Sequence, residues 1–191
     1  IIVKMFQNQS VYDFSCPFVI GDAAFLNEVA LKLASSVSIT PISSPEKALF
    51  IPGSIDVLDL KNISTTINAG QPNALSGQVS VEYIRVAVNL ALDHKVEAIV
   101  TAPINKQSVH LAGFTWPGHT EMLADFTGTK DVALMLTGEA LRVVIATTHV
   151  PLNQVGALIT HKQVINTIKL THLWLLEYVT ETPKIALTGL N

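Results

Sequence analysis

The chain has 191 residues, of which 49% are hydrophobic and 14% charged, and its formal net charge at pH 7 is −3. A negative net charge does not attract nucleic acid or an anionic membrane. No apolar run approaches the roughly 20 residues of a membrane-spanning helix. A single cysteine, Cys16, excludes an internal disulfide and a thiolate zinc cluster. The charged fraction is well below the roughly 25% of ordinary soluble domains, which indicates that much surface is buried, in part against another subunit. We therefore expect a soluble protein of the reducing cytoplasm, with one large domain or one domain and part of another.

The first third of the chain alternates between helix and strand patterns. Apolar residues three and four positions apart predict helices, and short apolar runs bounded by Gly or Pro predict strands. In chain order we expect a helix at 1–6, a strand at 17–20, a helix at 23–34, and strands at 37–42, 48–51 and 55–60.

The rest of the chain continues this alternation. Helical spacing predicts a long helix over 77–93, an apolar run before Pro103 predicts a central parallel strand at 98–101, and a capping box that pairs Thr160 with Gln163 begins a helix ending near 178. The remaining expected elements are helices at 107–111 and 120–126, a hairpin of strands at 132–136 and 141–146, and a strand at 184–187. Together these elements predict an α/β fold with helices on both faces of a sheet that includes some antiparallel strands.

Three segments carry polar side chains at the ends of these elements. In the first, Lys106 follows the strand at 98–101, where it could neutralise a phosphate or carboxylate. The alternative is a surface lysine on the first turn of a short helix, which is equally consistent with the sequence.

The second segment reads WPGHTEML, from Trp116 to Leu123. A Pro-Gly turn places Gly118 at the N-cap of the next helix, so the N–H groups of His119 and Thr120 belong to its first turn. Free N–H groups and the helix dipole favour an anion such as phosphate, and the two side chains add further donors. Alternatively, His119 shares one helical face with apolar residues and is a core histidine with a satisfied side chain.

The third segment is a strand that ends in Thr147, Thr148 and His149, with Pro151 preventing its continuation. An imidazole at this position suits a metal ion or a proton transfer. One histidine does not make a metal site, and a capping histidine is the alternative. The chain contains none of the common glycine-rich nucleotide motifs or the nucleophile-elbow motif, so a nucleotide would bind by another device.

Three stretches in this order, TAPINKQSVHLAGFTWPGHTEMLADFTGT, LRVVIATTHVPL and LTGLN, resemble one family, the NAD-dependent 4-hydroxythreonine-4-phosphate dehydrogenases of vitamin B6 biosynthesis. The resemblance runs from Ile1 to Asn191. Roughly the last two fifths of a family chain would then be absent. We also expect the natural start to be missing, because the chain opens on Ile rather than on Met.

The resemblance implies oxidation of 4-phosphooxy-L-threonine with NAD and a divalent metal, with zinc as first choice and cobalt or magnesium as other choices. The 3-oxo product would then lose carbon dioxide to give 3-amino-2-oxopropyl phosphate. His119 and Thr120 correspond to the pair that binds the phosphorylated substrate. His149 corresponds to the first of three histidines that hold the metal, and the other two would lie beyond Asn191. Lys106 matches a family lysine, to which we assign no catalytic role.

The resemblance also implies a three-layer α/β/α fold with a mixed sheet, similar to isocitrate and isopropylmalate dehydrogenases. The subunit would have two domains, with residues 1–20 and about 145–191 in the first and the elements between them in the second. A homodimer would share the active site at the subunit interface. This arrangement agrees with the low charged fraction.

Other functions remain open at this stage. A related dehydrogenase could act on 4-phospho-D-threonate or phosphoerythronate, and the motifs do not separate these substrates. A phosphate acyltransferase of similar fold would need neither metal nor NAD, and the segment from Thr147 to Leu152 argues against it. A non-catalytic small-molecule-binding domain is the third alternative.

Overall fold

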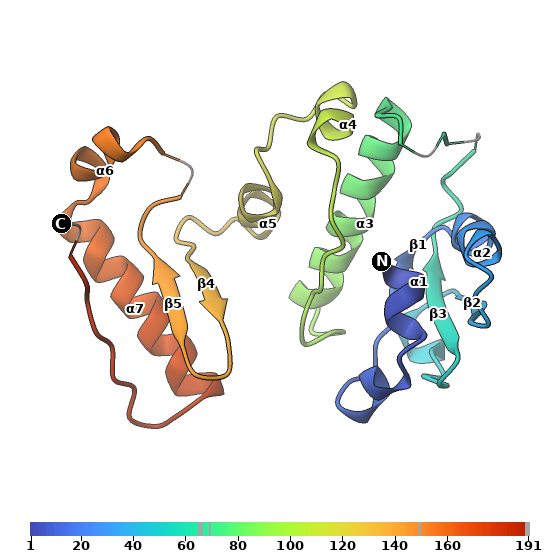
Figure 1. Ribbon diagram of the computed structural model, residues 1–191, viewed down its shortest axis with the longest axis horizontal. Coiled ribbons are helices and arrows are strands. Elements are labelled where there is room, and N and C mark those ends of the chain that lie inside the picture. The colour runs from blue at the N-terminus through green and yellow to red at the C-terminus, as the bar shows by residue number, and fades with distance from the viewer. Residues whose placement is uncertain (65–66, 69, 149, 190–191) are drawn as a thin grey trace. The chain divides into compact units, whose positions relative to one another are not determined.

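The computed structural model describes residues 1–64, 67–68, 70–148 and 150–189 (Figure 1). Its contacts divide the chain into two compact units, Ile1–Thr127 and Gly128–Asn191. Within the described ranges, every helix is too short or too polar to cross a membrane.

The first unit contains a parallel sheet of three strands in the order β1-β3-β2 (Figure 1). Val19 of β1 lies opposite Val57 of β3, and Ile39 of β2 lies opposite Ile55. The elements of this unit are α1 (Ile2–Phe6), the 3-10 helix η1 (Gln9–Asp13), β1 (Val19–Gly21), α2 (Ala23–Lys32), β2 (Ser38–Ile42), the 3-10 helix η2 (Pro45–Lys47), β3 (Ser54–Asp59), α3 (Ala74–Leu92), α4 (Lys106–Leu111) and α5 (His119–Thr127).

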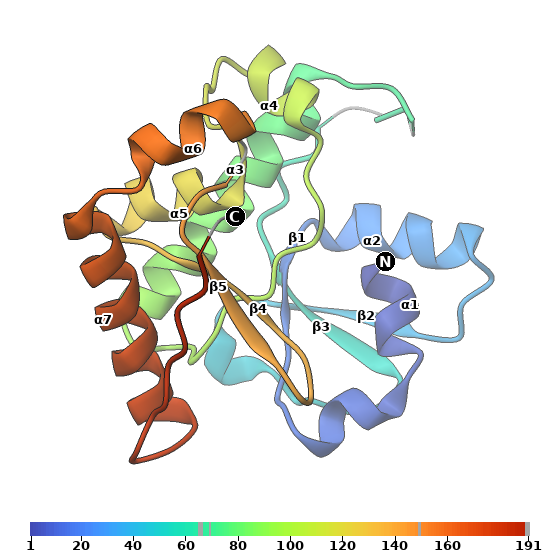
Figure 2. The same ribbon diagram turned by 60° about the vertical axis from the view of Figure 1, so that its left-hand side comes forward.

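Two separate clusters of buried side chains stabilise this unit. The first joins the sheet to α1 and α2 and consists of Val3, Phe6, Ala23, Ala30, Val37, Ile55 and Val57. The second lies among α3, α4 and α5, which are grouped together in Figure 2, and consists of Val81, Ile84, Val88, Val109 and Met122. The beginning of α5 is therefore positioned by helix packing rather than by the sheet.

Helices α3 and α4 approach each other unusually closely at Gly77. A Cβ atom added to Gly77 would lie 2.0 Å from the carbonyl oxygen of Ser108. The same contact is stabilised by polar groups, because the Ser108 hydroxyl accepts a hydrogen bond of 3.2 Å from the Asn73 N–H. Asn73 and Asn105 cap α3 and α4, each through a 2.8 Å bond from a backbone N–H to its side-chain oxygen. Glycine is needed at 77 because the two backbones leave no room for a side chain.

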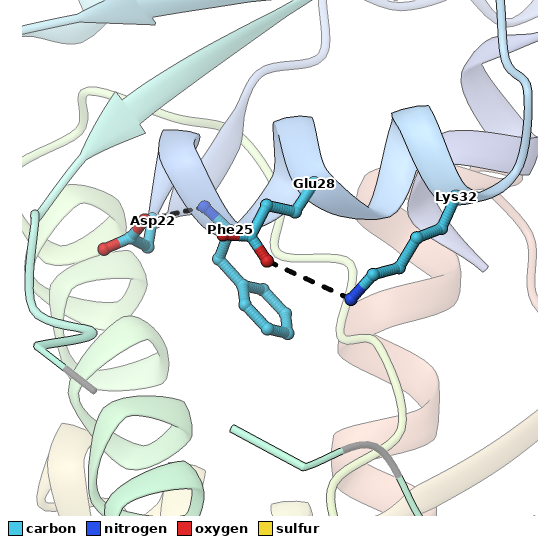
Figure 3. A network of polar contacts seen from close by, with 4 residues as sticks. All are labelled: Asp22, Phe25, Glu28 and Lys32. Atoms are coloured by element: carbon cyan, nitrogen blue, oxygen red, sulfur yellow. Dashed lines mark hydrogen bonds and ion pairs between the residues drawn. The ribbon is translucent and has the colours of Figure 1, made fainter. Parts of the chain in front are cut away.

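Asp22 joins three segments at the carboxyl end of the sheet, and Figure 3 shows its contact with the start of α2. It directly follows β1, is only 6% exposed, and accepts a 2.9 Å hydrogen bond from the Phe25 N–H at the start of α2. Its second carboxylate oxygen accepts a 3.1 Å bond from the N–H of Ile63, in the loop after β3. Farther along α2, Glu28 and Lys32 form an exposed ion pair of 4.0 Å, which contributes little to stability.

The loop after β3 is also held from α3. The Tyr83 hydroxyl donates a 2.7 Å hydrogen bond to the Asn62 side-chain oxygen, and the Asn62 amide donates a 2.8 Å bond to Glu82. Burial raises the pKa of the Tyr83 phenol, and the negative charges of Asp22 and Glu82 raise it further. Tyr83 therefore stays protonated at neutral pH and remains a donor.

The second unit contains an antiparallel hairpin and two helices. Its elements are β4 (Leu134–Thr137), β5 (Arg142–Ile145), α6 (Leu152–Leu158) and α7 (His161–Tyr178). The Thr160 hydroxyl caps α7 by accepting a 3.2 Å bond from the Gln163 N–H. The Gln163 side chain donates to the carbonyl of Ala146, which ties the first turn of α7 to the end of β5.

Most predicted elements are confirmed within one to four residues, and so is the α/β class with its parallel strands. Among the described residues, the first unit holds a three-stranded parallel sheet and the second a two-stranded antiparallel hairpin, so the expected mixed sheet stays a prediction. The expected reach of the Gln163 side chain back to Thr160 is wrong, because that side chain binds Ala146 instead. Helix α6 is an additional element, and Pro151, which was expected only to end a strand, stands at its N-cap.

Three expected strands are not formed in the described part of the chain, at 48–51, 98–101 and 184–187. In the first, Phe50 has a φ of 53°, and the N–H groups of Leu49 and Phe50 donate to the buried Asp56 carboxylate. In the second, Val100 is 88% exposed. A strand requires a partner strand for its backbone groups, and the described residues pair neither 98–101 nor 184–187 with one.

We predict that Gly77→Ala destabilises the protein by about 1–3 kcal/mol, because the added methyl group forces the backbone of α4 to move. Gly156→Ala is the matched control. Gly156 also lies within a helix, but nothing stands within 4 Å of its added Cβ, so that change should be neutral or stabilising by up to about 1 kcal/mol. Urea unfolding of both variants measures the difference, and equal stabilities would contradict the close approach.

We also predict that the two hydrogen bonds of Asp22 can be separated by substitution. Asp22→Ser keeps a cap for α2, but the serine side chain is too short to reach Ile63. The free energy of unfolding should therefore fall by about 1–2 kcal/mol, and hydrogen exchange at the Ile63 amide should become faster. Asp22→Ala should lose about 1 kcal/mol more, because the cap also disappears. Glu28→Ala is the control, with an expected change below about 0.5 kcal/mol. Unchanged Ile63 exchange in Asp22→Ser would refute the tether.

Candidate active site

The three segments singled out by the sequence occupy different elements. Lys106 begins α4, and His119 and Thr120 begin α5, all within the first unit. Thr147 and Thr148 follow β5 in the second unit, and His149 lies outside the described residues.

The start of α5 has the expected local geometry. The first helical hydrogen bond runs 3.3 Å from the Met122 N–H to the Gly118 carbonyl, which puts Gly118 in the N-cap position. His119 and Thr120 are then the first two helical residues, whose N–H groups lack partners within the helix. The Glu121 carboxylate lies 3.5 Å from the place of a Cβ on Gly118, so a bound anion would share this turn with a negative side chain.

The side chain of His119 is the unusual feature of this turn. Its Nε2 atom is buried and has no hydrogen-bond partner among the described residues. Leaving a buried polar atom unpaired costs about 1–3 kcal/mol, and such atoms are rare in native proteins. A core histidine with a satisfied side chain would have a hydrogen-bond partner for Nε2. The geometry therefore favours the interpretation in which Nε2 binds a ligand or another polar group.

The residues of α5 that follow His119 pack into the second buried cluster. Met122, one helical turn farther on, is fully buried in the cluster among α3, α4 and α5. Leu123 and Phe126 pack against the same cluster. The apolar face of α5 expected from the sequence is therefore present, and His119 lies at the N-terminal end of that face.

Lys106 remains compatible with both of its interpretations. It is exposed on the first turn of α4, and the Asn105 side chain caps that helix. The helix has only 6 residues, so its dipole offers little to a ligand.

The end of β5 also has an unpaired buried atom. The Gln163 amide nitrogen donates to Ala146, but its Oε1 atom is buried without a partner within the described ranges. This acceptor lies at the beginning of the Thr147-Thr148 segment. The sequence does not reveal this acceptor, because the capping-box pattern directs the Gln163 side chain to the start of its own helix.

A metal site is not formed by the described residues alone. Residues 1–64, 67–68, 70–148 and 150–189 bring no three His, Cys, Asp or Glu side chains together. The only member of the expected ligand set that this chain contains is His149, which lies outside those ranges.

A cavity of about 480 Å³ lies at the carboxyl ends of β2 and β3, which is where open α/β sheets commonly bind ligands. It is lined by Thr40, Pro41, Ile42, Ser43, Lys47, Asp59 and Lys61. The Lys47 ammonium donates a 2.8 Å hydrogen bond to the Ser43 hydroxyl, so part of its donor capacity is already used. This cavity was not predicted, because the sequence does not reveal that β2 and β3 end side by side.

Comparison with known proteins gives consistent matches over the chain. The chain is 38% identical over its full length to a D-threonate 4-phosphate dehydrogenase from Cupriavidus necator, and 35% identical to a 4-hydroxythreonine-4-phosphate dehydrogenase from Desulforapulum autotrophicum. It spans 57% of the length of each of these relatives. A solved structure of a 4-hydroxythreonine-4-phosphate dehydrogenase from Burkholderia phymatum matches 96% of this chain and 56% of its own, with a TM-score of 0.89 and 37% identity.

A family model gives the same result. The model described as pyridoxal phosphate biosynthetic protein PdxA matches residues 13–191, which include all three of the segments discussed above. The chain therefore belongs to the PdxA family of pyridoxal phosphate biosynthetic proteins.

Proposed function

We propose that this chain is part of an NAD-dependent dehydrogenase that oxidises 4-phosphooxy-L-threonine in pyridoxal phosphate biosynthesis. The observation that carries the proposal is the buried, unpaired Nε2 of His119 at the start of α5. Membership of the PdxA family supports the same substrate class, since relatives over the whole chain are named for phosphorylated hydroxy acids.

The proposed roles of His119 and Thr120 follow from their position. The first turn of α5 offers N–H groups and the positive end of the helix dipole, which favour a phosphate. The imidazole of His119 and the hydroxyl of Thr120 add side-chain donors at the same place. We assign these two residues to the phosphate group of the substrate.

The oxidation itself converts a secondary alcohol to a ketone. The hydride on the carbon that carries the hydroxyl group passes to NAD, and the hydroxyl proton is released. The product, 2-amino-3-oxo-4-phosphooxybutanoate, loses carbon dioxide to give 3-amino-2-oxopropyl phosphate. A bound divalent metal would lower the pKa of the substrate hydroxyl group as a Lewis acid.

His149 is the proposed metal ligand of this chain, and imidazole accepts zinc, cobalt and other divalent ions. The other two metal ligands are expected, from the family resemblance, in residues beyond Asn191. We further propose a cytoplasmic homodimer with the active site at the subunit interface. Its subunits would have the layered two-domain fold of isocitrate dehydrogenases, with residues 1–20 and about 145–191 in one domain.

A second candidate substrate is 4-phospho-D-threonate. It is favoured by the 38% identity to a protein named D-threonate 4-phosphate dehydrogenase. Both substrates carry a terminal phosphate and a secondary hydroxyl group, so the proposed role of His119 is the same for both.

The test of the function is NADH formation by the full-length protein with 4-phosphooxy-L-threonine, 4-phospho-D-threonate or phosphoerythronate. We expect turnover with the first, loss of turnover after chelation, and recovery on addition of zinc. His149→Ala should remain inactive after zinc is added, while its circular dichroism spectrum is unchanged. Turnover of only the D-threonate phosphate would change the substrate and keep the reaction, whereas no NADH with any of the three would reject the dehydrogenase assignment.

We predict that His119→Asn mainly weakens substrate binding. Loss of a hydrogen bond to a charged phosphate corresponds to about 1.5–3 kcal/mol, so KM should rise by roughly 10- to 150-fold. Metal affinity should stay unchanged, because His119 is not among the proposed metal ligands. Steady-state kinetics and zinc titration measure the two effects, and an unchanged KM would remove His119 from the phosphate site.

A further inference from the structure

An aromatic and polar cluster surrounds the residue that leads into the Pro-Gly turn. The Trp116 ring stacks on Phe114 with centroids 5.1 Å apart and planes inclined by 21°, and meets Phe126 edge-on at 5.2 Å. The Trp116 indole N–H donates a 3.2 Å hydrogen bond to the Asp125 carboxylate. Asp125 and Phe126 both belong to the last turn of α5.

This cluster joins the residue before the Pro117-Gly118 turn to the C-terminal end of α5. Trp116 precedes the Pro117-Gly118 turn, while Asp125 and Phe126 lie at the other end of the helix that the turn begins. The chain therefore folds back along α5 and is held there by a hydrogen bond and a ring contact. We call the contacts of Trp116 with Asp125 and Phe126 the Trp116 clamp.

The clamp is anchored to the body of the first unit. The guanidinium of Arg85, on α3, lies 5.1 Å from the centroid of the Phe126 ring. Such a cation–π contact is favourable because the positive charge lies over the electron-rich face of the ring. Phe114 and Trp116 also pack against the buried cluster among α3, α4 and α5. The entry to the turn is thus fixed relative to the helices.

His119 needs such support, because its buried Nε2 has no partner among the described residues to fix the orientation of the ring. The orientation must then come from the backbone of the turn and from packing. Pro117 restricts one backbone angle of that turn, and the clamp fixes the residue before it. Holding a binding group in place before the ligand arrives reduces the entropy lost on binding.

We propose that Trp116, through its hydrogen bond to Asp125, is a positioning residue that holds His119 ready for the substrate phosphate. This inference rests on the proposed function of His119. Trp116 itself is not assigned to the ligand, because its only polar hydrogen already goes to Asp125.

The test compares four variants of the full-length protein with one further control variant. Trp116→Phe keeps an aromatic ring and removes the N–H donor, Asp125→Ala removes the acceptor, and a double variant removes both. Asp125→Asn keeps an oxygen that can accept the bond and serves as the conservative rescue. Trp174→Phe is the matched control, because Trp174 also contacts a neighbouring ring, that of Tyr178 at 5.6 Å, but lies on α7.

The measurements are KM and kcat with the phosphorylated substrate that turns over, and the Kd of inorganic phosphate by calorimetry. We expect Trp116→Phe and Asp125→Ala each to raise KM and Kd about fivefold, the size of one hydrogen bond, with kcat changed less than twofold. The double variant should show the same fivefold effect, because both changes remove one bond. Asp125→Asn and Trp174→Phe should resemble the unmodified protein.

Three outcomes would overturn the inference. These are multiplied effects in the double variant, an Asp125→Asn variant as weak as Asp125→Ala, or a fall in kcat with KM unchanged. The His119→Asn variant distinguishes a failure of the positioning role of Trp116 from a failure of the phosphate-binding role of His119. If His119→Asn raises KM and Trp116→Phe does not, the positioning role fails while the phosphate site stands; if neither raises KM, both fail.

Discussion

Hydrogen bonds from backbone N–H groups to a few side-chain oxygens determine where the loops of the first unit run. Asp22 receives one from the start of α2 and one from the loop after β3, and Asp56 receives two from residues 49 and 50. Asn73 and Asn105 do the same at the starts of α3 and α4. Because buried N–H groups must be paired, these four side chains decide the path of the chain between regular elements. The start of α5 is held in position by helices that depend on them.

Against this background, the unpaired Nε2 of His119 is significant. The buried carboxylates of Asp22 and Asp56 both accept hydrogen bonds, whereas the buried Nε2 of His119 has no partner among the described residues. The Trp116 clamp gives the same turn rigidity without using any polar atom of His119. In our proposal, Trp116 and Asp125 shape the turn, and the imidazole of His119 binds the phosphate group of the substrate.

Local patterns in the sequence predicted the local features of the structure. The helices followed from apolar spacing and caps such as Thr160, and the turn at Gly118 followed from its Pro-Gly pair, because these signals act within a few residues. The prediction of a strand at 98–101 was wrong, because strand formation depends on partner strands that are distant in sequence. The bond between Trp116 and Asp125 and the role of Asp56 were equally hidden, since nothing in either sequence neighbourhood marks them. The positions of His119 and His149 suggested an anion site and a metal ligand, with alternatives open, and family resemblance then specified the substrate phosphate and the three-histidine site. Of these two residues, only His119 has a structural observation beside its proposed role.

The close approach at Gly77 has a consequence for reading natural variation in this family. Glycine inside a helix is intrinsically unfavourable by roughly 1 kcal/mol relative to alanine, so α3 carries a local weakness in exchange for its contact with α4. Any side chain at 77 would displace the backbone at Ser108, two residues after Lys106. A variant there would lower the cellular amount of protein by favouring unfolding and clearance, and would do so without touching a ligand. In a genetic screen, such a position would resemble an active-site residue although it has no chemical role.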